Sequence, residues 1–157
     1  MRPREENQPM DDLQKMLIER ACERLVTEYC HFVDHGEAAK IAGQFTEDGV
    51  WASGKIMRSG RAEIAAAFGQ REANAARISR HVCCNLLVDV IDEDHAKGVV
   101  YLTLYRNDGE VGRRSAPSDV PDVVGEYRDQ FVRTAEGWRF KRRDVGVSFA
   151  KVQPKAG

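Results

Sequence analysis

The sequence predicts an α+β domain in which a strongly bent, mostly antiparallel sheet forms a conical half-barrel around N-terminal helices. Two observations predict this fold class. Helical periodicity dominates the first half of the chain, whereas long runs of strand-forming residues fill the second half. At 157 residues the chain is also long enough to bury one continuous core without disulfides or metal ions. We therefore expect the sheet to cover its apolar face with the helices.

The N-terminal third predicts a flexible arm followed by a long helix. Residues 1–10 are polar and contain prolines, and Asp11 or Asp12 then provides an acidic helix start. Apolar side chains follow in two adjacent lines with i, i+4 spacing, Leu17, Ala21, Leu25, Tyr29 and Val33 on one and Ile18, Cys22, Val26 and Cys30 on the other. Gly36 is a typical helix end, and residues 37–45 favour a second, short helix.

The remaining elements follow from strand and turn signals. We expect a strand at 50–52, a turn at 57–60, a helix at 62–68, a hairpin of 78–91 with 97–106, a loop at 107–122 and a hairpin of 123–134 with 138–149. The domain organisation is then an arm over 1–10, one domain over 11–150 and a tail over 151–157.

Charge and hydropathy narrow the range of partners. The 24 basic and 25 acidic residues give a net charge of −1, so no overall field attracts nucleic acid. No apolar run approaches the ~20 residues that span a bilayer, and the first residues lack the apolar stretch of a signal peptide. We expect a cytoplasmic protein that binds neither nucleic acid nor a membrane.

Neither the cysteines nor the neighbouring histidines predict a metal site. The four cysteines, Cys22, Cys30, Cys83 and Cys84, form no Cys-x-x-Cys pair, and we expect reduced thiols that act as small buried hydrophobes. His31 and His35 have a spacing that suits zinc, but no third ligand is evident. We therefore expect no metal site.

Asp34 is the first candidate for chemistry. It continues the second apolar line by one more i+4 step, which puts a carboxylate where an apolar residue is expected. A carboxylate that leaves water needs a hydrogen-bond partner, and an imidazole N–H is the partner useful at neutral pH. Alternatively, Asp34 lies past the buried part of the helix and is solvated. Helical phase alone leaves both interpretations open.

His81 is the second candidate. Strand alternation places Ser79, His81, Cys83, Asn85 and Leu87 on one face. Either this face is the half-solvated side of the sheet, or it lines a pocket with His81 as general base and Asn85 as a hydrogen-bond donor. Near the C-terminus, Arg143 shares a face with Val145 and is expected to reach that pocket, whereas Arg142 is expected to be solvated.

Four segments resemble the SnoaL-like branch of the nuclear-transport-factor-2-like superfamily, which has a cystatin-like fold. They are residues 29–37, 45–51, 80–85, and 125–127 together with 138–143. The resemblance extends over roughly residues 12–149, and the branch includes ketosteroid isomerases, scytalone dehydratase, bile acid 7α-dehydratase and a hexachlorocyclohexane dehydrochlorinase.

The resemblance implies roles for particular residues. Asp34 and His81 match the catalytic Asp–His dyad of the dehydratases and the dehydrochlorinase. Tyr29 and Arg143 match the tyrosine and arginine of the bile acid dehydratase pattern, Tyr29 with a catalytic role. Arg143, Asn85, Trp51 and Tyr127 are the candidate substrate-binding residues. Because the dehydrochlorinase has lysine where this chain has Tyr29, the resemblance favours loss of water over loss of halide.

The expected function is that of a lyase without cofactor. It would dehydrate an apolar alicyclic, polyketide-like or steroid-like hydroxylated molecule, with His81 as general base. The alternatives are a non-catalytic small subunit of a ring-hydroxylating oxygenase, and an isomerase or epoxide hydrolase on the same fold. Apolar residues on the outer sheet face predict a homo-oligomer, and the resemblance makes this a trimer before a dimer.

Overall fold

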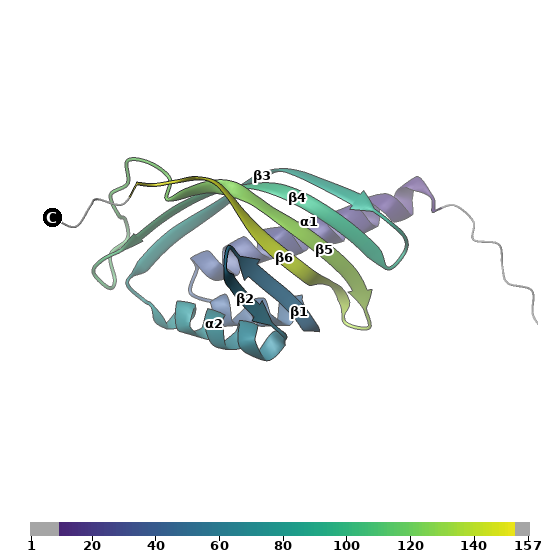
Figure 1. Cartoon of the computed structure of the whole chain (residues 1–157), viewed down its shortest axis with the longest axis horizontal. Coiled ribbons are helices and arrows are strands. Elements are labelled where there is room, and N and C mark those ends of the chain that lie inside the picture. The colour runs from purple at the N-terminus through teal and green to yellow at the C-terminus, as the bar shows by residue number, and fades with distance from the viewer. Residues whose placement is uncertain (1–9, 153–157) are drawn as a thin grey trace, which may run out of the picture.

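The computed structural model describes residues 10–152 (Figure 1). Its elements are α1 (Asp12–Asp34), the 3₁₀ helix η1 (Ala38–Gln44), β1 (Phe45–Ser53), β2 (Ile56–Ser59), α2 (Arg61–Ala73), β3 (Arg77–Val90), β4 (His95–Asp108), β5 (Val123–Thr134) and β6 (Gly137–Ala150). The expected flexible arm and tail lie outside the described residues, apart from Met10, which packs against the core, and residues 151–152. The two segments expected to be a strand at 50–52 and a turn at 57–60 are the paired strands of the β1–β2 hairpin.

The predicted fold class is confirmed. The described strands form one sheet in the order β2-β1-β6-β5-β4-β3, in which only the β1–β6 pair is parallel. Figure 1 shows β3 to β6 curving as an arch, with α1 along its inner side and α2 beside β1 and β2. No helix within residues 10–152 has both the length and the apolar character to cross a membrane.

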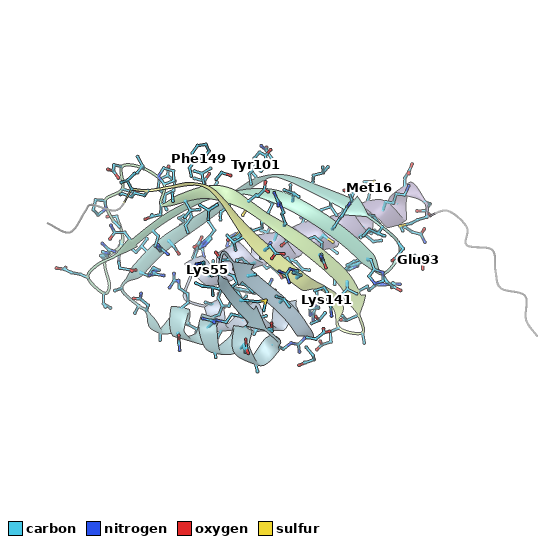
Figure 2. All side chains as sticks on the ribbon, in the orientation of Figure 1. Met16, Lys55, Glu93, Tyr101, Lys141 and Phe149 are labelled. Carbon is cyan, nitrogen blue, oxygen red and sulfur yellow. The ribbon has the colours of Figure 1, made fainter. Side chains whose placement is uncertain are left out.

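Helix α1 begins and ends as its sequence predicts. Asp11 accepts a hydrogen bond from the Gln14 N–H at 2.7 Å, and Gln14 accepts one from the Asp11 N–H at 3.0 Å, which completes a capping box. At the other end Gly36 has a φ of 75°, a conformation that glycine adopts without strain. The two apolar lines are buried from Ile18 onward except at Ala21, which is half-buried. Leu17 is exposed near the N-terminal end of α1, where Figure 2 labels the neighbouring Met16.

The buried face of α1 meets the inner face of the sheet. Tyr127 is buried, and Trp51 and Trp138 are half-buried against the same cluster, as predicted. The rings of Phe45 and Phe131 pack on Phe140, with centroid separations of 5.2 and 5.3 Å. Aromatic rings thus fill the closed part of the half-barrel and leave the other end for a cavity.

A bulge in β3 interrupts the alternation of side chains. The register of β3 against β4 shifts between Cys84 and Leu87, and Asn85 has a φ of 54°. A bulge adds one residue, so the faces exchange beyond it. Ser79, His81 and Cys83 therefore face inward, whereas Asn85 and Leu87 are exposed. The expectation that all five share one face was wrong.

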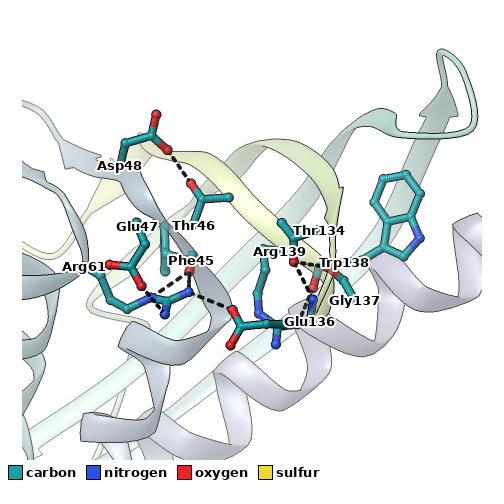
Figure 3. Close-up of polar contacts among 10 residues, drawn as sticks. All are labelled: Phe45, Thr46, Glu47, Asp48, Arg61, Thr134, Glu136, Gly137, Trp138 and Arg139. Atoms are coloured by element: carbon teal, nitrogen blue, oxygen red, sulfur yellow. Dashed lines mark hydrogen bonds and ion pairs between the residues drawn. The ribbon is translucent and has the colours of Figure 1, made fainter.

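One arginine joins α2 to the sheet. Arg61, the first residue of α2, donates two hydrogen bonds to the Phe45 carbonyl at 2.7 and 3.1 Å, and forms ion pairs with Glu47 and Glu136 (Figure 3). Glu136 belongs to the turn between β5 and β6, so these contacts hold three segments together. They fix the start of α2 against β1 and the β5–β6 turn.

Candidate active site

An inner cavity of about 400 Å³ opens between the helices and the concave face of the sheet. Its wall is mainly apolar and aromatic, formed by Val33, Trp51, Ile56, Ala67, Phe68, Leu102, Leu104, Val123, Val145 and Val147. Polar side chains also reach it, among them Tyr29, Tyr127, Ser79, His81 and four arginines, Arg58, Arg71, Arg77 and Arg106. An apolar cavity with a small number of convergent polar groups is the typical form of a small-molecule site.

Asp34 and His81 meet in the wall of this cavity. Asp34 is the last residue of α1 and His81 lies in β3, which packs on α1. His81 Nδ1 lies 2.7 Å from Asp34 Oδ1, and the backbone N–H of His81 donates to Asp34 Oδ2 at 2.7 Å. The side chain of Asp34 is 5% exposed and that of His81 is 11% exposed. Asp34 is therefore a buried, hydrogen-bonded carboxylate and not a solvated helix end.

Two further residues hold the carboxylate, and the sequence analysis had not singled out either. Ser79 donates to Asp34 Oδ1 at 2.7 Å, and Arg71 donates to the Ser79 hydroxyl at 3.0 Å and to the Val33 carbonyl at 3.1 Å. The sequence could have indicated Ser79, because strand alternation puts it on the same face as His81. Arg71 lies on α2, and no sequence pattern linked it to Asp34. Burial alone would raise the pKa of Asp34, but the hydrogen bonds and charge of His81, with the Ser79 bond, lower it overall.

The hydrogen bond to Asp34 assigns the tautomer of His81. An ionised carboxylate accepts but does not donate, so the proton between the two groups belongs to His81 Nδ1. In the neutral ring Nε2 then carries a lone pair. His81 lines the cavity, and no residue within 10–152 forms a hydrogen bond with Nε2. The dyad thus presents a proton acceptor to the cavity and a carboxylate behind it that stabilises the imidazolium.

Two tyrosines supply hydroxyl groups to the cavity. The Tyr29 hydroxyl accepts a hydrogen bond from Trp51 Nε1 at 3.0 Å, which leaves its own proton for a ligand oxygen. The Tyr127 hydroxyl has no hydrogen bond to any described side chain or backbone group. Burial raises the pKa of Tyr29 and of Tyr127 well above the ordinary value, so both are neutral donors.

Arg143 was predicted to bind substrate, but the structure places it behind the cavity wall. Its side chain is fully buried and does not line the cavity. Nε and Nη2 donate to the two carboxylate oxygens of Asp129 at 2.8 and 2.7 Å, and the guanidinium packs on the rings of Tyr127, Phe140 and Tyr29 at 4.1 to 4.3 Å. Burial would lower the pKa of Arg143, but the Asp129 carboxylate raises it, so the cation persists. Arg143 therefore supports both tyrosines from behind.

Asn85 was also predicted to line the cavity, but the β3 bulge turns it to the outer face, away from the cavity.

The other polar candidates lie outside the cavity as well. His31 and His35 are exposed with stacked rings 5.4 Å apart, and the described residues contain no His, Cys, Asp and Glu group of three that could hold a metal ion. Arg142 pairs with Asp144 on the strand.

The four cysteines are free thiols, with Cys22 and Cys30 buried, Cys83 half-buried and Cys84 exposed. Cys30 Sγ lies 3.4 Å from Cys83 Sγ. None of the four lines the cavity.

Comparison with known proteins agrees with this architecture. The SnoaL-like domain family matches residues 14–144. None of the curated proteins matches the chain significantly. A Novosphingobium aromaticivorans structure provisionally assigned as a scytalone dehydratase has 20% identity and a TM-score of 0.78, covering 93% of this chain and 95% of that one.

Two other solved structures are similar. An NTF2-like protein with a cystatin-like fold, also from N. aromaticivorans, has 27% identity and a TM-score of 0.70, covering 88% of this chain and 92% of that one. The structure of LinA, a hexachlorocyclohexane dehydrochlorinase, has 17% identity and a TM-score of 0.75, covering 94% of this chain and 97% of that one.

Proposed function

The chain belongs to the SnoaL-like domain family, and on that premise we propose that it is a lyase that removes water from an apolar, hydroxylated carbonyl compound. One observation carries the proposal. His81 Nδ1 lies 2.7 Å from a buried carboxylate, and the same side chain lines a mainly apolar cavity with no described hydrogen-bond partner for Nε2. A neutral imidazole in this arrangement is a general base that works near neutral pH.

The elimination uses groups of this chain alone. His81 Nε2 takes a proton from the carbon next to the carbonyl, or vinylogous to it, and the C–H electron pair forms the new C=C bond. The C–O bond to the hydroxyl breaks, and its electron pair leaves with oxygen. The imidazolium returns its proton to that oxygen, which gives water and neutral His81. Asp34 stabilises the imidazolium between the two transfers.

Negative charge develops on the carbonyl oxygen as the proton leaves. Tyr29 and Tyr127 are the neutral hydroxyl donors in the cavity wall, and each is held against the Arg143 guanidinium. Donors fixed in place before reaction stabilise such charge most in an apolar site from which water is excluded. We assign the carbonyl oxygen to these hydroxyls, and Trp51 to the positioning of Tyr29.

Relatives support the same chemistry and narrow the substrate. The similar structures include the provisional scytalone dehydratase and the hexachlorocyclohexane dehydrochlorinase, whose names denote the removal of water and of hydrogen chloride. We propose an alicyclic, polyketide-like or steroid-like hydroxylated ketone, because the cavity wall is rich in branched and aromatic side chains.

A second candidate is a non-catalytic subunit of a ring hydroxylase. One similar structure from N. aromaticivorans is provisionally named an aromatic ring hydroxylase, with 23% identity and a TM-score of 0.71. In such a subunit the dyad would have no catalytic role, and the protein would need a larger metal-bearing partner. An isomerase or epoxide hydrolase would use the same cavity and give a different product.

Single-turnover assays on hydroxylated steroid-like and polyketide-like ketones test the proposal, with the product identified by mass. We expect loss of 18 Da as water, and a decrease of ~10²–10⁴-fold in the His81→Ala variant because the proton acceptor is removed. Asn85→Ala is the matched control, since Asn85 lies in the same strand but faces outward. Equal loss in both variants, or a product of unchanged mass, would contradict a lyase based on His81.

We also propose that the protein is a cytoplasmic homo-oligomer, a trimer before a dimer. Tyr101 and Phe149 are exposed on the side of the sheet away from the helices (Figure 2). Val82 and Leu87 are exposed on β3, the strand that pairs with β4, which carries Tyr101. An apolar surface of this kind is typical of an interface, and free thiols suit a reducing compartment. Light scattering at micromolar concentration should report a trimer, and a monomer would refute the assembly.

A further inference from the structure

The mouth of the cavity is strongly basic. Arg58, Arg71, Arg77 and Arg106 line the cavity, and no Asp or Glu is among the described residues that line it. We propose that the substrate carries an anionic group, a carboxylate or phosphate, which Arg58 and Arg106 bind at the mouth while the apolar body lies inside. This proposal rests on the proposed function only in taking the cavity as the substrate site.

Arg58 and Arg106 are the arginines available to a ligand. Within residues 10–152 neither forms an ion pair; the Arg58 guanidinium has only a 3.4 Å hydrogen bond to the Met57 carbonyl, and that of Arg106 has none. Both are exposed. A guanidinium binds carboxylate or phosphate with two parallel hydrogen bonds, so each has this capacity unused.

The register of the strands aims both side chains at the cavity. Arg106 pairs with Ser79, which faces inward, and side chains of directly paired residues lie on the same face. Arg58 pairs in the same way with Trp51, which lines the cavity. The two arginines therefore approach the mouth from different strands, β4 and β2.

The strand register gives the distance along β4 between the proposed anion site at Arg106 and the level of His81. His81 pairs with Leu104, two residues before Arg106 on β4. Two residues of a strand span about 7 Å, so the anionic group lies about that far along β4 from the level of the dyad. The substrate we infer is therefore an apolar hydroxylated ketone with its anionic group several bonds from the carbon that loses a proton.

The other two arginines add to the positive potential but are already engaged. Arg77 pairs with both oxygens of Asp108 at 2.7 Å, and Arg71 holds Ser79. Burial and then the charge of Arg77 lower the pKa of Arg71, with a smaller effect from Arg106, which places these cations near one another. Asp108, and Asp122, which accepts the Arg106 backbone N–H, lie beside the mouth without lining the cavity.

A pair of fluorescent probes tests the inference. 8-Anilinonaphthalene-1-sulfonate and N-phenyl-1-naphthylamine share one aromatic body, and only the first is anionic. We expect the anionic probe to bind about tenfold more tightly, and the preference to decrease as salt is added. The probes are titrated into the His81→Ala variant as well as the wild type, so that binding is read without turnover.

Substitution of the two arginines locates the effect. The Arg58→Gln/Arg106→Gln variant should bind both probes equally. Lys97→Gln is the matched control, because it removes a positive charge from the same strand about 30 Å from Arg106, and it should retain the preference. Displacement of the anionic probe by 2-naphthoate, 2-naphthyl phosphate or neutral 2-naphthol then distinguishes a carboxylate from a phosphate ligand.

The outcomes separate this inference from the proposed lyase activity. Equal binding of the two probes by the wild type, or an unchanged preference in the double variant, would overturn the anionic substrate while leaving the elimination untouched. A strong preference that the double variant loses supports the inference even where no elimination is detected. Failure of the double variant to fold is checked by far-UV circular dichroism, and the single Arg58→Gln and Arg106→Gln variants then decide.

Discussion

Two acid–base pairs lie on the inner side of the sheet, and they differ in what surrounds them. Asp34 and His81 are hydrogen-bonded at 2.7 Å in the wall of the cavity, and the imidazole lines this cavity. Asp129 and Arg143 are joined by two hydrogen bonds of similar length, but both side chains are 0% exposed and aromatic rings cover the cation.

The two pairs therefore have different roles, one structural and one proposed to be catalytic. An arginine that stays protonated and has no path to the cavity cannot exchange a proton with a substrate, so the Asp129–Arg143 pair stabilises the core and positions Tyr29 and Tyr127. A histidine held in one tautomer with an accessible lone pair can exchange a proton. Burial and hydrogen bonding are therefore common to both pairs, and access to the cavity is what distinguishes the proposed catalytic pair.

The largest expected effect on stability comes from breaking the buried pair. Asp129→Ala leaves the Arg143 cation without its partner in the core, and removal of one member of a buried pair costs about 3–5 kcal/mol. Denaturant unfolding monitored by circular dichroism measures the loss. Asp144→Ala, which removes the half-exposed partner of Arg142, should cost less than about 1 kcal/mol. Similar losses in the two variants would mean that the Asp129–Arg143 pair does not support the core.

The next effect is on turnover, and it is expected at the Asp34–His81 pair and not at the Asp129–Arg143 pair. Asp34→Asn keeps the shape of the side chain, but the amide can hold the other tautomer of His81 and cannot stabilise the imidazolium. We expect turnover to decrease about 100-fold with binding of the anionic probe largely retained. Single-turnover rates and probe titration measure the two quantities separately. Unchanged turnover would remove Asp34 from the mechanism.

A smaller effect appears in the acid dependence of stability. The hydrogen bonds from His81 and Ser79 outweigh burial and lower the native pKa of Asp34 below its ordinary value near 3.9. The carboxylate therefore contributes its full stability above the unfolded pKa, and the contribution is lost as pH falls through the native pKa. Unfolding free energies between pH 7 and pH 3 should decrease less steeply in Asp34→Asn than in the wild type. Parallel pH profiles would contradict the lowered pKa.

The contrast between these pairs also marks how far the sequence could lead. Helical phase put Asp34 in line with the buried residues of α1, and strand alternation put His81 on one face with Ser79, but neither pattern decided whether these side chains were buried; the structure shows that both are. Asn85 was placed on the wrong face because simple alternation assumes a strand without a bulge. The bulge after Cys84 reverses the faces, and the sequence analysis did not predict it.

Arg143 was placed on the correct face with the wrong role. It points inward, as alternation predicts, but its role depends on Asp129, which lies opposite it across the β5–β6 pair. Only the register of two strands brings these residues together. The arginines at the mouth were missed for the same reason, because Arg58 and Arg106 come from β2 and β4, far apart in sequence, and line one cavity only because the sheet is curved.

The protonation of His81 tests the central claim most directly. Long-range ¹H–¹⁵N correlation spectra of the ¹⁵N-labelled protein at neutral pH distinguish a protonated ring nitrogen from one with a lone pair. The account predicts that His81 carries its proton on Nδ1, donated to Asp34, with Nε2 unprotonated in the free protein, and that Asp34→Asn changes this distribution. A His81 protonated on Nε2, or a spectrum unaffected by Asp34→Asn, would contradict the proposed base.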